Sequence, residues 1–287
     1  MSLHFVLIGA LFAGIIALIA WRANALTAGG AIAAFVVGTL TYATGTLGFT
    51  FVLLAFFVPS VLLSRVGRAR KRALVDVGKH GARDAMQVIA NGGVATACAV
   101  VWAFVHDPRW ALAFAGAYAA ATADTWATEI GTLARRQPRS ILTLRPVPTG
   151  MSGGITLPGT LAEIAGAVWL GAAGLFGIAL AYVLNAADVG LLWPAHAPAA
   201  IVFPPTMLLA IPAGGIAGAT ADSLLGATAQ ELRRCEACKR TCETDPHACG
   251  EPTRLVRGLP GFSNDVVNLL ATAVGAAAAF AVGTLAR

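Results

Sequence analysis

The sequence predicts an all-α protein, a polytopic bundle of about eight transmembrane helices with its active cleft at the cytoplasmic face. Three observations favour this fold: an apolar composition, regularly spaced apolar runs, and acidic residues near the predicted ends of several runs. Of 287 residues, 57% are hydrophobic and 12% are charged, and the mean hydropathy is +0.74. Soluble domains carry about 25% charged residues. The 32 glycines fit helices that pack closely in lipid.

The apolar runs set the expected spans, because about 20 apolar residues cross a bilayer as a helix. Only Gly-Thr-Leu-Gly separates the second run from the third, and the sixth is long enough to be tilted or broken. The first run has no basic stretch before it, so we expect a spanning helix rather than a cleaved signal peptide. We treat 1–287 as one integral-membrane domain with a cysteine-rich loop, 231–260, inserted in it. The predicted spans are 3–21, 26–46, 47–64, 86–105, 110–130, 155–184, 199–221 and 264–285.

The basic residues predict the orientation. Of 20 Lys and Arg residues, 18 fall in four loops that an eight-span topology places on one side. Basic loops stay in the cytoplasm, so both termini are expected outside, in a bacterial inner membrane. The densest run, 65–83, has two interpretations: it fixes topology alone, or it also attracts phosphates and anionic headgroups.

An Ala-Thr-Ala-Asp element occurs twice, in "AAATADTWATEIG" and in "GATADSLLGATAQ". Its acids, Asp124 and Asp222, close the fifth and seventh predicted spans. Asp265 begins the eighth span and Asp84 precedes the fourth, so we expect four carboxylates at one level of the membrane. Acids at this depth face the protein interior or a wet cleft. The alternative is that they only form hydrogen bonds between helices.

Other polar residues accompany these acids. Gln87 and Asn91 continue the helical face of Asp84, Thr128 shares the face of Asp124, and Glu163 lies inside the sixth span. Carboxylates attract phosphates only through a cation, and Mg²⁺ binds one or two carboxylates together with substrate phosphates. We therefore predict catalytic Mg²⁺ at Asp124, Asp222 and Asp265. The expected substrate-binding residues are Asp84, Gln87, Asn91, Thr128, Glu129, Thr149, Gly150, Ser152, Gly153, Gly154, Asn264 and Asn268.

The loop "RPVPTGMSGGITLPGT" supplies the glycines and hydroxyls of that set. Backbone N–H groups in such a turn, followed by a helix N-terminus, can hold a phosphate, and Arg145 just upstream could clamp it in a catalytic role. No Gly-Lys-Ser/Thr follows, so this is not a Walker A loop. A re-entrant or helix-breaking role is the alternative.

Four of five cysteines cluster in "CEACKRTCETDPHACG", whereas Cys98 is expected to be a core residue. The Cys-x2-Cys spacing of Cys235 and Cys238 is typical of a structural zinc site. Cys249 supplies a third ligand, and either Cys242 or His247 the fourth. Stable disulfides are not expected in the cytoplasm. The alternative is a reduced loop without metal.

Together with "RGLPGFSNDVVNLL", these motifs resemble the integral-membrane family of transmembrane protein nineteen and phytyl-phosphate kinase, formerly a domain of unknown function. The resemblance runs from "QVIANGG" at the fourth span to the last span. It implies a membrane kinase that converts phytyl phosphate or another isoprenyl monophosphate into the diphosphate. The donor would be a nucleoside triphosphate, with CTP as the candidate. Its other partner is the lipid bilayer, and no nucleic acid is expected.

Two other functions fit parts of the pattern. A cytidylyltransferase that forms a CDP-lipid would use the same metal and nucleotide. A secondary transporter would explain the repeated Asp-bearing helices, although coupling sites usually lie near the midplane rather than at one face.

Overall fold

The computed structural model describes residues 3–69, 71, 81–186 and 209–285, and these are predominantly helical. The expectation of a predominantly helical fold is therefore confirmed. The helices are α1 (Leu3–Arg22), α2 (Ala28–Arg65), α4 (Ala85–Val105), α5 (Pro108–Gly131), α6 (Leu157–Ala186), α8 (Ala210–Thr228) and α9 (Asn264–Leu285). The strands are β1 (Arg139–Ser140), β2 (Gly154–Ile155), β3 (Leu232–Cys235), β4 (Thr241–Cys242) and β5 (Thr253–Arg257).

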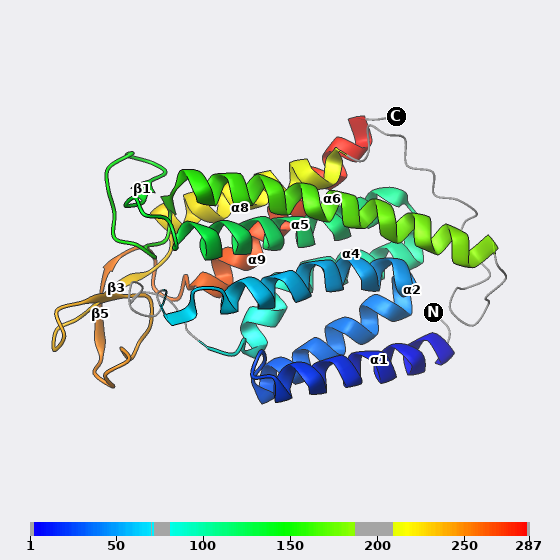
Figure 1. The fold of residues 1–287 in the computed structure, drawn as a ribbon, viewed down its shortest axis with the longest axis horizontal. Helices are drawn as coiled ribbons and strands as arrows, with labels where there is room; N and C mark the ends of the chain where they lie inside the picture. Colours follow the sequence, from blue (N-terminus) through cyan, green and yellow to red (C-terminus); the bar gives the residue numbers. More distant parts are fainter. Residues whose placement is uncertain (1–2, 70, 72–80, 187–208, 286–287) are drawn as a thin grey trace.

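The helices run along the long axis of the molecule as one bundle, and the strands gather at one end (Figure 1). α1 begins and α9 ends toward the opposite end. Four helices in the described ranges, α1, α2, α4 and α9, are long and apolar enough to cross a membrane. The fold is thus that of a helical integral-membrane protein, and the count of eight spans stays a prediction.

The second and third predicted spans form one assigned helix, α2, which is broken in the middle. The backbone leaves helical geometry at Thr46, with φ 50° and ψ −142°, and the ribbon turns back on itself there (Figure 1). Gly45 makes this reversal possible, because a Cβ on it would lie 2.0 Å from the Phe49 ring. The break therefore falls inside the Gly-Thr-Leu-Gly stretch that separates the two runs in the sequence.

Small residues set the close packing of α5, α8 and α9. A Cβ on Gly116 would lie 2.4 Å from that of Ala279, and one on Gly214 would lie 2.5 Å from the carbonyl oxygen of Gly275. In lipid, helices associate through such close van der Waals contact rather than through the hydrophobic effect. This packing brings the two Ala-Thr-Ala-Asp elements together, because one lies on α5 and the other on α8.

Aromatic side chains hold the second arm of α2 against its neighbours. The Phe49 ring stacks on Phe114 with centroids 4.1 Å apart, and Phe56 stacks on Tyr118 at 5.4 Å. Trp102 of α4 meets Phe49 from another side. Such pairs add about 0.5–1.5 kcal/mol each beyond the area they bury. They fix α2, and hence the basic residues at its end, relative to α5.

The two motif acids lie inside their helices rather than at helix ends. Residues 199–208 of the predicted seventh span lie outside the described residues. The expectation that Asp222 closes this helix is wrong, since α8 continues to Thr228. Asp124 likewise precedes the end of α5 by seven residues, or about 10 Å at ~1.5 Å per residue. Both carboxylates therefore lie within the helical bundle, at a distance from the loops, where α5 and α8 still pack against each other.

The loops beyond the helices form two small sheets. β1 pairs antiparallel with β2, matching Arg139 to Ile155, and this hairpin carries the glycine loop, residues 149–156. The cysteine loop, residues 231–260, contains a three-stranded sheet in the order β4-β3-β5. Both sheets lie at the same end of the bundle (Figure 1).

Candidate active site

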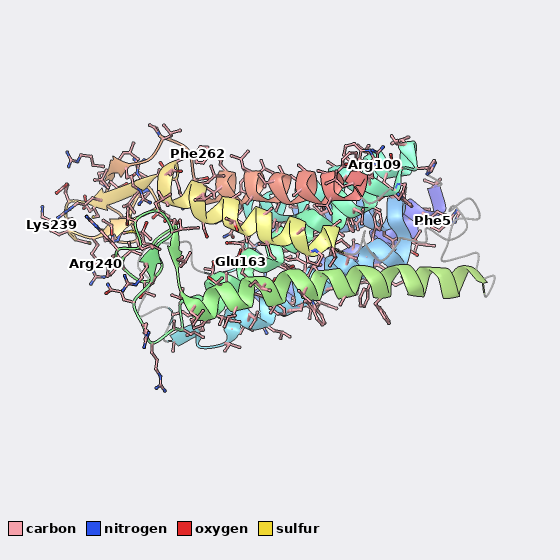
Figure 2. The ribbon with its side chains drawn as sticks, turned by 90° about the horizontal axis from the view of Figure 1, so that it is seen from above. Phe5, Arg109, Glu163, Lys239, Arg240 and Phe262 are labelled. Carbon is pink, nitrogen blue, oxygen red and sulfur yellow. The ribbon has the colours of Figure 1, made fainter. Side chains whose placement is uncertain are left out.

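A polar cleft with a volume of about 420 Å³ opens where the helices meet these loops. Residues from α2, α4, α5, α6, α8 and α9 line it, together with both loops. In Figure 2, Lys239 and Arg240 lie at the loop end, Arg109 lies at the opposite end, and Glu163 lies between them on α6. The lining contains these residues singled out from the sequence: Gln87, Asn91, Asp124, Thr128, Glu129, Thr149, Gly150, Ser152, Gly153, Gly154, Glu163, Asp222, Asn264 and Asn268.

The carboxylates of Asp124 on α5 and Asp222 on α8 lie close enough for the charge of each to act on the other. Oδ2 of Asp222 is buried without a hydrogen-bond partner in the described structure. Glu163 approaches the pair from α6 and contacts Thr220. Acids this close repel each other when both are ionised, so the donor set fits a hard cation that prefers oxygen ligands.

Backbone contact explains why these side chains converge. A Cβ on Gly218 would lie 2.3 Å from that of Ala120, and one on Gly166 of α6 would lie 3.2 Å from the Cα of Ala123. The alanines and glycines around each acid thus remove the bulk that would separate α5, α6 and α8. The repeated element supplies both the acid and the small residues that let two such acids meet.

Glu243 is an acid of the cleft that the sequence analysis missed. It follows β4 in the cysteine loop and accepts a hydrogen bond from Oγ of Ser152 in the glycine loop. Burial raises the pKa of Glu243 to about 7, and the Ser152 hydroxyl acts against that rise. Its charge also acts on Asp222. A glutamate in a loop rich in charged residues carries no sequence signal beyond its place next to Cys242.

Four basic side chains line the same cleft: Arg65, Arg68, Lys71 and Arg83. Lys71 forms an ion pair with Glu129. Burial lowers the pKa of Arg83, and the charge of Glu129 acts against that shift. The basic run 65–83 therefore contributes to the cleft as well as to the charge asymmetry. Its other members, Arg70, Arg72 and Lys79, lie outside the described residues.

The glycine loop rests directly on α8. Gly153 has φ +79°, and a Cβ on it would lie 2.4 Å from that of Ala227. Only glycine combines this left-handed backbone with so close an approach. Residues 149–156 of this loop therefore line the cleft together with Asp124 and Asp222, and their binding of phosphate stays a prediction. Arg145 does not accompany them, because it is exposed and does not line the cleft.

Two of the four predicted carboxylates do not line the cleft. Asp84 caps α4: its Oδ1 accepts the N–H of Gln87 at 2.9 Å, while Gln87 Oε1 accepts the N–H of Asp84 at 3.1 Å. This capping box shares the i, i+3 spacing of a polar stripe, which is why the sequence suggested a binding face. Asp265 is 7% exposed in the first turn of α9, and its neighbours Asn264 and Asn268 line the cleft in its place.

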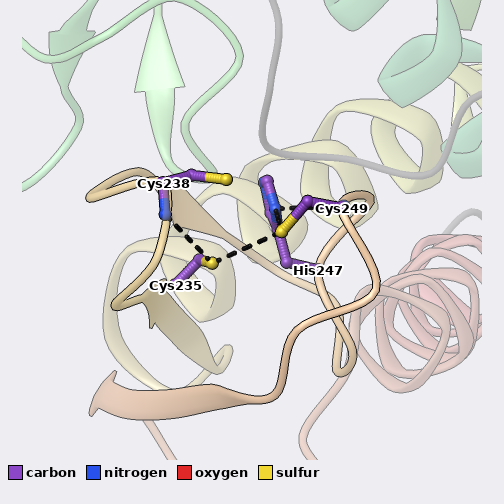
Figure 3. Close-up of side chains that lie close together, drawn as sticks. All are labelled: Cys235, Cys238, His247 and Cys249. Atoms are coloured by element: carbon purple, nitrogen blue, oxygen red, sulfur yellow. Dashed lines mark hydrogen bonds between the residues drawn. The ribbon is translucent and has the colours of Figure 1, made fainter.

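The cysteine loop gathers Cys235, Cys238, His247 and Cys249 (Figure 3). Their ligand atoms all lie within 4.8 Å of one another. The sulfurs of Cys235 and Cys249 are 3.7 Å apart, and tetrahedral zinc with bonds of ~2.3 Å would set them roughly 3.8 Å apart. The His247 ring holds the pKa of Cys249 down to about 6, which favours the thiolate that metals bind.

Cys242 stands apart from this cysteine cluster. It is buried, and its thiol donates to the carbonyl oxygen of Thr244 at 3.5 Å. Of the two candidates for a fourth ligand, the structure groups His247 with the other three cysteines. The donor set, three thiols and one imidazole, fits a closed structural zinc site.

The sequence matches the family model described as "Integral membrane protein DUF92" over residues 11–276. Protein PGR of Arabidopsis thaliana is 31% identical over 284 residues, covering 91% of this chain and 90% of that protein. The uncharacterized membrane protein MJ0933 of Methanocaldococcus jannaschii is 34% identical, covering 74% and 78%. Protein VTE6, chloroplastic, of Arabidopsis thaliana is 30% identical, covering 53% and 47%. No solved structure matches.

Proposed function

Since this chain belongs to the DUF92 family of integral membrane proteins, we propose that it is a membrane kinase acting on isoprenyl monophosphates. It transfers a phosphoryl group from a nucleoside triphosphate, with CTP as the candidate donor, to phytyl phosphate or another isoprenyl phosphate. The resemblance of its motifs to the phytyl-phosphate kinase family supports this choice of acceptor.

One observation carries the proposal. A single cleft contains two facing carboxylates, Asp124 and Asp222, together with a glycine loop and the basic side chains of Arg65, Arg68 and Arg83. Acids alone would repel phosphates, and bases alone would bind any anion. Their combination suits a substrate made of phosphates and a divalent cation.

The chemistry asks little of the protein beyond positioning. An oxygen of the acceptor phosphate attacks the γ-phosphorus of the nucleotide, the bond between that phosphorus and the β,γ-bridging oxygen breaks, and the nucleoside diphosphate leaves. The attacking oxygen is already anionic, so no strong general base is needed. Arginine side chains and loop N–H groups would stabilise the charge on the transferred group.

Mg²⁺ is the cation that this donor set would hold, with Asp124 and Asp222 as protein ligands. When bound, it would neutralise charge on the nucleotide phosphates. Glu163 and Glu243 border the same space and would orient its waters or first ligands. Zinc in the cysteine cluster would have a structural role, because four protein ligands leave no open position.

We also propose eight membrane spans with the cleft at the cytoplasmic side of a bacterial inner membrane. The two arms of α2, together with α1, α4, α5, α6, α8 and α9, supply the segments for this count. Basic loops support the orientation. A cysteine introduced at position 140, with its labelling mapped by mass spectrometry separately from that of the native cysteines, should resist impermeant thiol reagents in intact cells and react in inverted vesicles. Labelling of this cysteine from outside intact cells would show that the orientation is the reverse of the one proposed.

The activity is tested with purified protein in detergent and Mg²⁺. Isoprenyl monophosphates of several lengths are combined with CTP, ATP, GTP and UTP, and the products are identified by mass spectrometry. Isoprenyl diphosphate and nucleoside diphosphate support the kinase. A CDP-lipid with pyrophosphate would identify a cytidylyltransferase instead. Absence of any nucleotide turnover with every acceptor contradicts both enzymes and leaves transport to be measured in vesicles.

A further inference from the structure

A second, apolar pocket adjoins the polar cleft. It lies between α1, both arms of α2 and α4, and three residues, Arg83, Gln87 and Asn91, line both spaces. The rest of its lining is almost entirely apolar, for example Phe12, Ala34 and Leu53. We call this pocket the apolar groove. The junction of an apolar space with a polar one is the geometry that an amphiphile requires.

The groove is narrow. Along the first arm of α2 its lining runs from Ala34 to Tyr42, which is roughly 12 Å at ~1.5 Å per residue. Its volume is about 80 Å³, so it suits part of one hydrocarbon chain better than a two-chain lipid. Phe12 on its wall is 43% exposed, which leaves the side of the groove open to the bilayer. Glycine at positions 9 and 38 keeps α1 and α2 close while leaving this channel.

The residue at the junction is a guanidinium without an anion of its own. Arg83 forms no ion pair in the described structure, because the nearby acid Glu129 pairs with Lys71. Its guanidinium carbon lies 5.7 Å from the centre of the Phe56 ring, which also lines the groove. Its main chain is fixed to the turn between α1 and α2, where its N–H donates to Ala25 and its carbonyl accepts from Thr27.

We propose that the apolar groove binds the hydrocarbon tail of a single-chain lipid monophosphate, whose phosphate is held at the junction by Arg83, Gln87 and Asn91. This rests on the proposed function for the identity of the acceptor and divides the cleft between its two substrates. The acceptor phosphate enters from the side of α4, and the nucleotide occupies the side of the glycine loop and α8. Charge complementarity selects a monophosphate, and the narrow channel excludes two-chain phospholipids.

The groove can be tested by binding without nucleotide. Purified full-length protein is irradiated with farnesyl monophosphate carrying a diazirine in its tail, and labelled peptides are mapped by mass spectrometry. Labels are expected in residues 9–20, 34–57 and 87–92, with competition by unlabelled farnesyl monophosphate. Removing one charged hydrogen bond costs about tenfold or more in affinity, so Arg83→Gln should weaken labelling by that factor and Arg83→Lys by less.

A matched pair of α2 variants checks the channel itself. Ala34→Phe fills the groove and should abolish labelling there. Val36→Phe, on the exposed side of the same helix, should leave labelling unchanged. Far-ultraviolet circular dichroism and size exclusion report whether each variant is folded. If Ala34→Phe misfolds, Ala34→Leu takes its place, and it should reduce labelling of the groove to a smaller extent.

The two hypotheses fail separately. Labels confined to α6 and α8, or equal competition by farnesol or by a phosphatidyl lipid, overturn the groove even if the kinase is active. Labels in the groove that depend on the phosphate and on Arg83, in a protein that forms no diphosphate, reject the kinase and leave a lipid monophosphate site.

Discussion

The polar cleft and the cysteine cluster are built from similar numbers of ligating side chains, yet their geometry differs. In the cysteine cluster all four ligand atoms lie within 4.8 Å of one another. In the polar cleft, acids from three helices and a loop surround about 420 Å³ of space, and one oxygen of Asp222 has no hydrogen-bond partner among the described residues. Ligands that converge fill a coordination sphere, whereas ligands that surround space leave positions for exchangeable groups. The first geometry is typical of a structural metal site, and the second is typical of a catalytic site.

One contact joins the two regions. Glu243 belongs to the cysteine loop, but its carboxylate accepts a hydrogen bond from Ser152 of the glycine loop and borders the motif acids. Whatever holds the cysteine loop in shape therefore also holds one wall of the cleft. Perturbing the cysteine cluster should weaken activity indirectly, whereas perturbing the acids should remove it directly.

The largest effect is expected for the motif acids. Asp124→Asn and Asp222→Asn keep side-chain volume but lose charge, and loss of one preorganised charge-stabilising group costs about 10²–10³-fold in turnover. Both variants should stay folded, because the amide still offers an acceptor and removes repulsion between two acids. The measurement is initial rate with saturating Mg²⁺ and nucleotide.

Asp107→Asn is the matched control for these variants. Asp107 pairs with Arg109 at the opposite end of the bundle, so this variant should keep its activity. A wild-type rate in Asp124→Asn or Asp222→Asn would eliminate the pair as metal ligands.

The acids could be predicted because charge is rare in apolar helices. Asp124, Asp222 and Glu163 each interrupt such a run, and each lines the cleft. The same rule misleads where a helix starts: Asp84 also lies next to an apolar run, but it caps the helix. The sequence alone does not separate an N-cap from a ligand, because a carboxylate can serve in either role.

Charged residues in loops give the opposite problem. Glu243 lies among other charged residues of the cysteine loop, so its position gives no separate sequence signal. The basic run 65–83 has two interpretations from the sequence, and only the tertiary structure shows that Arg65 and Arg68 line the cleft. The choice between His247 and Cys242 as ligand likewise depends on how β3 and β4 pair. The break in α2 was visible as a short polar stretch, but its reversal at Thr46 depends on one residue with positive φ.

A smaller effect is expected when the cysteine cluster is opened. Cys235→Ser should reduce bound zinc from about one per chain, lower the thermal unfolding temperature, and decrease turnover several-fold without abolishing it. Cys242→Ser should retain zinc, because Cys242 lies outside the cluster. Metal analysis by mass spectrometry and thermal unfolding in detergent measure both. A zinc-free wild-type protein of full stability would show that the cluster has no structural role.

The next effect concerns pH and Glu243. Its folded pKa is raised to about 7 by burial, so the folded state holds a proton that the unfolded chain has already lost. Stability from this group is complete below the unfolded pKa of about 4.3 and is lost as pH rises toward 7. Without divalent cations, the unfolding temperature of the wild type should fall between pH 5 and 8.

Glu243→Gln should flatten that dependence, whereas Glu236→Gln should not. Glu236 is exposed, and pairing with Lys239 lowers its pKa, so it is ionised in both states across this range. An unchanged pH dependence in Glu243→Gln would assign the titration to another group.

The smallest effect is expected for Arg145, the arginine that the sequence placed beside the glycine loop. Its side chain is exposed and does not line the cleft, and substitutions at such positions change free energies by about 0.5 kcal/mol or less. Arg145→Gln should therefore alter turnover and the KM for nucleotide by no more than about 2-fold, the factor to which that energy corresponds. Arg68→Gln is the paired variant, because Arg68 lies just beyond α2 and lines the cleft. It should raise the KM for nucleotide or isoprenyl phosphate about 10-fold, as loss of a charged hydrogen bond to phosphate does. A larger effect of Arg145→Gln than of Arg68→Gln would contradict this assignment. It would show that Arg145 reaches the nucleotide in a conformation with the glycine loop closed, and that Arg68 contributes less to phosphate binding than proposed.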